Sequence, residues 1–242
     1  MKKVILFSIM SLLPIFAWAS ITQAFQNEPK GFRGLNFGGL VGRYSPNFGE
    51  LKDYLDVASD FWEADLSFGE KTMYGLTVEH EIIPNFKVRG EWNGFNTQIS
   101  VKDGHGWTGY RAKYELNLNS YTVSGIHMVS SEKPVSWYIG AGLGQFRTNF
   151  QWDEVISIRG SPVWSSTGKE TERPIGFQVL AGIKVGTGAV FLQGEARYLF
   201  AQVRMKDFQS VREYDGRRIE AITIDLSGLV LTVTAVVRFW EE

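Results

Sequence analysis

The stretch KVRGEWNG, residues 87–94, alternates charged or polar side chains with apolar or small ones. Successive residues of a strand point to opposite faces, so Lys87, Arg89 and Glu91 share one face and Trp92 lies on the other. Two kinds of barrel have strands of this type. In a soluble barrel the charged face meets water, whereas in a membrane barrel it faces the interior.

The chain begins with the features of a secretory signal peptide. A basic start and a short apolar run precede the small-residue motif that ends at Ala19, where we predict cleavage. The apolar run is shorter than the roughly 20 residues of a membrane-spanning helix. The predicted organisation is a signal peptide over 1–19, a periplasmic N-terminal segment over 20–29 and a single barrel domain over 30–242.

Composition excludes several classes of protein. The chain has no cysteine, which rules out a disulfide framework, a thiolate metal site and a lipid-modified cysteine. Its formal net charge of −1 argues against a nucleic-acid-binding surface. Aromatic residues make up 14% of the chain and glycines number 26, against seven prolines, which favours strands and tight turns. No cofactor and no metal site are predicted.

Period-two alternation recurs in eight segments. They lie near 31–44, 72–81, 86–101, 110–128, 135–152, 173–185, 189–205 and 221–240. The connections at 45–71, 102–109, 153–172 and 206–220 are mostly long and polar, whereas IIPN, SSEKP and GTG are short. This asymmetry is typical of bacterial outer-membrane barrels. The predicted fold class is all-β: an eight-stranded antiparallel up-and-down transmembrane β-barrel with short periplasmic turns and long extracellular loops.

A membrane barrel places its apolar faces against lipid and its aromatic residues at the two interfaces. The residues predicted for these aromatic girdles are Tyr74, Trp92, Tyr110, Trp137, Tyr198 and Phe239. In YRAKYELNLN, residues 110–119, the same reasoning sends Tyr110, Ala112, Tyr114, Leu116 and Leu118 to the lipid face.

The polar faces then line the interior. The predicted interior charges are Glu79, Glu81, Lys87, Arg89, Glu91, Arg111, Lys113, Glu115, Lys184, Glu195, Arg197 and Arg238. Seven are basic and five acidic, and this near balance favours ion pairs, because isolated charges in a narrow space are costly to desolvate. We expect the charges to plug the barrel. The alternatives are a narrow gated ion path and a small-molecule site.

The last strand, DLSGLVLTVTAVVRF, resembles the C-terminal insertion signal of bacterial outer-membrane barrels. The residues that carry this signal are Gly228, Leu229, Leu231, Val233, Ala235, Val237 and Phe239. With YIGAGLGQF and GFQVLAGIKVG, the chain from about residue 30 onward resembles the small outer-membrane β-barrel domains related to the outer-membrane protein A barrel and the opacity proteins. The resemblance implies insertion by the outer-membrane assembly machinery, among outer-membrane lipid and lipopolysaccharide.

Function is predicted less specifically. Leu51, Tyr54, Leu55 and Ala58 recur at helical spacing and indicate a short amphipathic helix. We expect it to pack over the barrel mouth as a lid, and the alternative is an interfacial helix or an adhesive surface for a partner. A structural or surface-interaction protein, with a host or surface ligand bound by its loops, is the leading hypothesis. A narrow passive channel for ions or small solutes is the alternative.

A lipid A-modifying enzyme is a third hypothesis. His127 lies close to Ser130 and Ser131, but near a periplasmic turn that a substrate of the outer leaflet would not reach. An esterase-like site also needs a base within reach of its nucleophile and a third, orienting group. No catalytic residue is therefore predicted.

Overall fold

The computed structural model describes residues 33–62, 70–105, 107–130, 134–186, 189–206, 208, 213–214, 217–218 and 221–239. The predicted signal peptide, its cleavage site and the segment 20–29 lie outside these residues. Among the helices within them, none has the length and apolar character needed to span a membrane.

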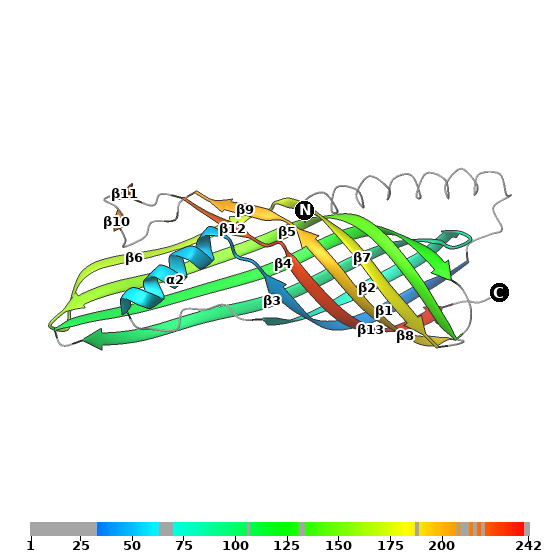
Figure 1. Ribbon diagram of the computed structural model, residues 1–242, viewed down its shortest axis with the longest axis horizontal. Helices are drawn as coiled ribbons and strands as arrows, with labels where there is room; N and C mark the ends of the chain where they lie inside the picture. The colour runs from blue at the N-terminus through cyan, green and yellow to red at the C-terminus, as the bar shows by residue number, and fades with distance from the viewer. Residues whose placement is uncertain are drawn as a thin grey trace, which may run out of the picture.

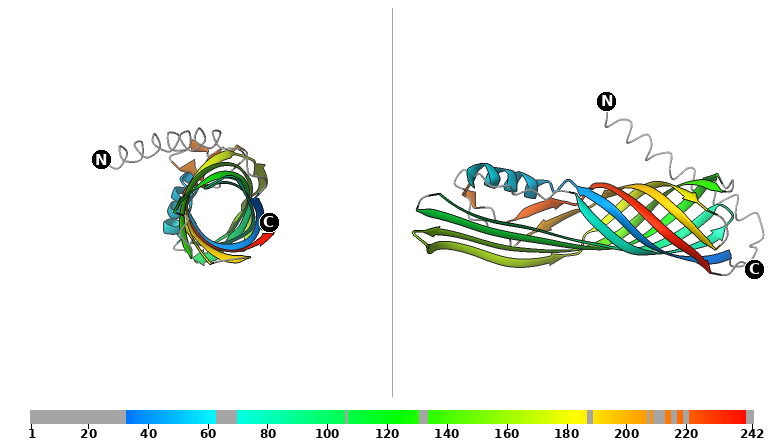
Figure 2. Two further views of the ribbon diagram at one scale, coloured as in Figure 1. Left: turned by 90° about the vertical axis from the view of Figure 1, so that its right-hand side faces the viewer. Right: turned by 90° about the horizontal axis from the view of Figure 1, so that it is seen from below.

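Eight antiparallel strands close into a ring. They are β1 (Arg33–Pro46), β2 (Lys71–Ile83), β3 (Phe86–His105), β4 (Thr108–Ser130), β5 (Val135–Ile158), β7 (Ile175–Val185), β8 (Val190–Phe200) and β13 (Gly228–Phe239). Each of these strands pairs with the next one in this list, and β13 closes the ring on β1. The ring is seen end-on in Figure 2. It confirms the predicted eight-stranded antiparallel barrel.

Three strands continue far beyond the ring. β3, β4 and β5 have 20, 23 and 24 residues, about twice the roughly 9 to 11 that cross a bilayer. Their outer parts, 95–105, 108–119 and 146–158, form a four-stranded sheet with β6 (Ser161–Glu172), and we call this sheet the extension. Figure 1 shows it projecting from the end of the barrel opposite to the C-terminus.

The prediction of long loops over 102–109 and 153–172 is wrong, because most of both segments is strand. Residues 153–172 are polar enough to suggest a loop, yet a sheet with one face in water tolerates polar strands. Arg159 and Gly160 have φ values of 52° and 79° and connect Ile158 directly to Ser161. Positive φ at both central residues is the geometry of a type I′ hairpin turn.

Smaller elements cover one face of the extension. They are helix α2 (Glu50–Trp62) and the ribbon of β9 (Gln202–Met205) and β12 (Ile222–Asp225). A further short pair is formed by β10 (Glu213–Tyr214) and β11 (Arg217–Arg218). The helix predicted in the first long connection is confirmed. Leu51, Tyr54 and Leu55 are buried, whereas the side chain of Ala58 lies outside the described residues.

The start of α2 is fixed to β12 by polar contacts. Phe48 donates its backbone N–H to the carbonyl of Asp225 at 2.7 Å, and the Glu50 carboxylate accepts the N–H of Thr223 at 2.7 Å. Phe48 and Gly49 both have positive φ, which turns the chain sharply from β1 into the helix. The helix is therefore held over the extension, as Figure 1 shows.

The main apolar core of the molecule lies between the extension and these covering elements. It includes Tyr114, Leu116 and Phe150 from the sheet and Leu55 from α2, all buried. The assignment of Tyr110, Ala112, Tyr114, Leu116 and Leu118 to the lipid face is wrong, since all five are buried and Leu116 has no exposed surface. Outside the membrane the inward face is covered by α2, so apolar side chains face inward there and polar ones meet water.

Candidate functional site: the charged interior of the barrel

Within the ring, the strands turn apolar side chains outward. Exposed, outward-facing apolar residues occur around the ring, among them Val41, Leu76, Val123, Leu143, Leu192 and Val233. Buried polar residues, such as Thr77, Thr122 and Thr232, occupy the opposite face. This is the sidedness of a membrane barrel, in which lipid contacts the outer surface.

The C-terminal signal residues follow the same alternation. Leu229, Leu231, Val233, Ala235 and Val237 are exposed on the outward face of β13, whereas Gly228 is buried on the other face. The side chain of Phe239 lies outside the described residues.

The aromatic residues predicted for the girdles divide into two groups. Tyr74, Trp137 and Tyr198 are exposed, and Trp92 is partly buried and packs edge-to-face against Tyr74 at a centroid distance of 6.1 Å. Tyr110 is buried in the core of the extension, so its assignment to a girdle is wrong.

Six charged side chains meet inside the ring, and we call them the charge cluster. They are Glu79 on β2, Lys87, Arg89 and Glu91 on β3, and Glu195 and Arg197 on β8, each at most 6% exposed. In the order of the ring, β3 and β8 are four strands apart in either direction. The cluster therefore joins opposite walls of the barrel.

Two arginines make the contacts across the lumen. Arg89 lies 2.6 Å from Glu79 on the neighbouring strand and also contacts Glu195 on β8. Arg197 lies 2.8 Å from Glu91 on β3 and 2.6 Å from Glu195. The third cation, Lys87, is 3.8 Å from Glu79. Three acids and three bases thus balance each other within the cluster.

Neutral side chains complete this arrangement. Tyr138 donates its hydroxyl to Glu195 at 3.0 Å, and Gln193 donates its amide to Glu79 at 3.0 Å. The Arg89 guanidinium carbon lies 5.4 Å from the centre of the Tyr138 ring. A Cβ atom at Gly182, which pairs with Tyr138, would come within 2.3 Å of that ring. Glycine at this position therefore makes room for the tyrosine that supports Glu195.

Six predicted interior charges are not in the cluster. Arg111, Lys113 and Glu115 lie on the outer surface of the extension, so their assignment to the lumen is wrong. The physical reason is that β4 keeps its alternation but changes environment at the edge of the ring. Arg111 is 3.7 Å from Asp153, and Lys113 is 3.9 Å from Glu115.

The other three charges, Glu81, Lys184 and Arg238, lie near the end of the ring opposite to the extension and are partly buried. The Lys184 ammonium is 3.6 Å, and the Arg238 guanidinium carbon 5.9 Å, from the centre of the Phe191 ring. Both cations lie within the roughly 6 Å over which an aromatic ring attracts a cation.

Sequence reasoning missed a second buried polar group, in the extension. Tyr54 on α2 donates its hydroxyl to Glu154 on β5 at 2.6 Å, and Tyr114 on β4 also donates to Glu154. Burial, followed by the nearby charge of Glu154, raises the pKa of Tyr114 well above its usual value. Glu154 falls in a segment predicted to be a loop, so no pattern in the sequence indicated its burial.

Comparison with known proteins gives similar folds and no similar sequence. No family model matches the chain, and no curated protein matches it. Similar solved structures include Neisserial surface protein A, which is 14% identical with a TM-score of 0.48 over 87% of this chain and 100% of that one. The N-terminal β-barrel domain of Pseudomonas aeruginosa OprF is 9% identical with a TM-score of 0.44 over 86% and 100%.

A third structure is Ail of Yersinia pestis, 11% identical with a TM-score of 0.41 over 86% and 99%. At these identities the likeness concerns the fold alone. The chain forms a closed ring with an exposed apolar belt and a buried polar face. This is the fold of a small outer-membrane β-barrel, the class that the sequence resembles.

Proposed function

We propose that the protein is an integral outer-membrane barrel whose extension acts outside the cell as a rigid surface for contacts with a ligand or partner. The observation that supports this most directly is the buried core beneath the extension, built from side chains such as Tyr114, Leu116 and Phe150. Projecting strands without such a core would be flexible, whereas a sheet packed on α2 keeps one shape. Rigid scaffolds that carry exposed residues are where recognition is usually found.

The charge cluster argues against a channel as the main function. Arg89 and Arg197 each contact a carboxylate on the opposite wall, so ion pairs cross the lumen rather than line it. Eight strands enclose only enough room for side chains or one small ligand. An interior of this kind favours a structural role for the ring, with recognition assigned to the extension.

Location and orientation can be tested by single-cysteine labelling, because the chain has no cysteine of its own. Thr167→Cys places a thiol on an exposed position of β6, and Pro84→Cys places one in the exposed turn between β2 and β3. We expect a membrane-impermeant maleimide to label Thr167→Cys on intact cells. Pro84→Cys should react only after the outer membrane is permeabilised, and labelling in the reverse order would contradict the proposal.

The role in recognition can be tested by shortening the extension. In the variant, β3 joins β4 at the Gln98–Glu115 pair and β5 joins β6 at the Gln151–Lys169 pair. Cells that express this variant should bind less to a panel of immobilised polysaccharides and proteins than cells with the full chain. Heat-modifiable migration in detergent gels checks that the shortened barrel is folded. Equal binding by a folded variant would contradict the proposed role.

A further inference from the structure

The outward face of the barrel changes from apolar to cationic on two neighbouring strands. On β5, Leu143 is 66% exposed, and the exposed residues that follow it toward the extension are Gln145 and then Arg147. At the start of β7, Ile175 is 77% exposed. Arg173, in the short connection between β6 and β7, is also exposed and lies two positions farther toward the extension. Both strands therefore pass from lipid-facing side chains to an arginine at the same boundary.

The two arginines face each other across the ladder. Gln145 pairs with Ile175 and Thr148 pairs with Glu172, so Arg147 lies opposite Arg173 in the same register. Directly opposite side chains on one face of a sheet lie about 5 Å apart at Cβ, and two like charges in these positions repel. Within the described part of the chain, neither arginine has an ion pair or a side-chain hydrogen bond.

Two other exposed arginines of the described surface, Arg43 and Arg111, have acidic partners. Arg43 is 3.2 Å from Glu70, and Arg111 is 3.7 Å from Asp153. On the outward face of β5, the first acid beyond Arg147 is Asp153, six residues away. An anion from outside the chain would therefore relieve the repulsion between Arg147 and Arg173.

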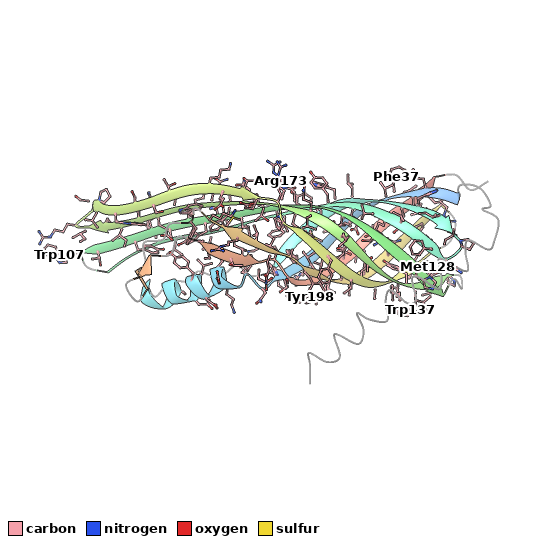
Figure 3. The ribbon with its side chains drawn as sticks, turned by 90° about the horizontal axis from the view of Figure 1, so that it is seen from above. Phe37, Trp107, Met128, Trp137, Arg173 and Tyr198 are labelled. Carbon is pink, nitrogen blue, oxygen red and sulfur yellow. The ribbon has the colours of Figure 1, made fainter. Side chains whose placement is uncertain are left out.

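The position of the pair suggests where that anion comes from. Figure 3 shows Arg173 where the barrel passes into the extension, farther toward Trp107 than Tyr198. Tyr198, Phe200 and Phe177 form an aromatic group at this level, with centroid distances of 4.7 Å and 4.3 Å. Aromatic side chains gather at the membrane–water interface, so the arginines lie at the level of lipid headgroups.

We propose that Arg147 and Arg173 together bind the phosphate group of an outer-leaflet lipid, with its acyl chains against Leu143 and Ile175. The proposal rests on the outer-membrane location proposed above. Guanidinium groups bind phosphate through paired hydrogen bonds and keep their charge at any physiological pH. The adjoining exposed apolar residues favour a phosphate that carries acyl chains over a free one.

The test uses the full chain in detergent, titrated with lipid A and observed by native mass spectrometry. Arg147→Gln/Arg173→Gln removes the site, and Arg43→Gln/Arg111→Gln removes the same charge elsewhere on the surface. We expect the site variant to bind lipid A about tenfold or more weakly, since a tenfold change in Kd needs only about 1.4 kcal/mol. The control variant should stay within about twofold of the wild-type chain.

Three results would overturn the lipid site. They are unchanged affinity of the site variant, equal loss in the control variant, and wild-type binding of dephosphorylated lipid A as tight as that of lipid A. Displacement of lipid A by an equal concentration of inorganic phosphate would assign the pair to free phosphate instead. Membrane fractionation of the wild-type chain tests the outer-membrane location separately from the lipid site. A protein recovered without detergent would contradict the proposed function itself, whereas a membrane-bound protein that fails the titration would contradict only the lipid site.

Discussion

At the scale of single residues, Glu91 and Glu115 show that the same residue type on neighbouring strands has different roles on either side of the ring boundary. Glu91 is buried and lies 2.8 Å from Arg197, which reaches it from the opposite wall. Glu115 is on the extension, partly exposed, and 3.9 Å from Lys113. The energetic value of an ion pair depends on such burial more than on the identity of its partners.

Replacing Glu91 by Ala should therefore destabilise the barrel. Arg197 would keep Glu195 but lose its partner on β3, and breaking a buried pair typically costs about 3 to 5 kcal/mol. The measurement is the free energy of unfolding in detergent. Glu115→Ala is the matched control, for which we expect a loss below about 1 kcal/mol. Equal losses of unfolding free energy in the two variants would contradict the view that burial makes the ion pairs of the charge cluster more stabilising than the exposed pair of Glu115.

Substitutions at two leucines distinguish the lipid face of the ring from the core of the extension. Leu143 is 66% exposed on the outside of the ring, and Leu143→Arg should impair membrane insertion, because an arginine on the lipid face costs up to about 2 to 4 kcal/mol. Leu116 is fully buried beneath the extension. Leu116→Arg should leave the ring in the membrane, disrupt the extension and make the extension sensitive to protease. The reverse pattern in fractionation and proteolysis would show that the two faces are assigned wrongly.

At the scale of elements, α2 determines whether the extension has a core. Leu55 packs from the helix into this core and is only 1% exposed, and Leu→Ala at such sites costs about 2 to 5 kcal/mol. We expect Leu55→Ala to lower the unfolding midpoint of the extension, measured by tryptophan fluorescence. The adjacent Asp56→Ala should have little effect, because Asp56 is exposed and makes only a 4.0 Å contact with Lys52.

The tyrosine–glutamate group beneath the helix gives the extension a dependence on alkaline pH. Burial raises the pKa of Tyr114 in the folded chain, whereas unfolded tyrosine has a pKa of about 10. Its contribution to stability is therefore complete below about pH 10 and is lost as the pH rises above that value, because only the unfolded form ionises readily.

We expect near-UV circular dichroism of the extension to decline above about pH 10. Tyr114→Phe should lower stability at neutral pH, since its hydrogen bond to Glu154 is lost, but should decline less steeply with rising pH. An unchanged slope in this variant would assign the alkaline transition to other groups, such as Tyr54.

At the scale of the whole molecule, a lumen crossed by ion pairs should not conduct. The wild-type chain is expected to give no stable conductance in planar bilayers. Glu91→Ala/Arg197→Ala removes one crossing pair, leaves Arg89 as the remaining cationic partner of Glu195, and should give brief openings. A stable wild-type conductance would contradict this interpretation and restore the channel hypothesis.

Sequence alone was sufficient for the ring. Alternation in segments such as KVRGEWNG and VFLQGEARYLF follows from the pleat of a strand, and the buried residues Arg89, Glu91, Glu195 and Arg197 were all found by it. The same rule correctly placed the apolar face of β13 outward. Local periodicity also located α2, since helical spacing depends only on neighbouring residues.

Only the tertiary structure decided what surrounds each face. Alternation shows that Leu116 and Glu115 point in opposite directions, but the direction that is buried depends on whether lipid or α2 lies beside the strand. The contacts across the lumen, Arg89 with Glu195 and Arg197 with Glu91, join residues 106 positions apart in the sequence. Periodicity carries no information about such partners, because they are set by closure of the ring.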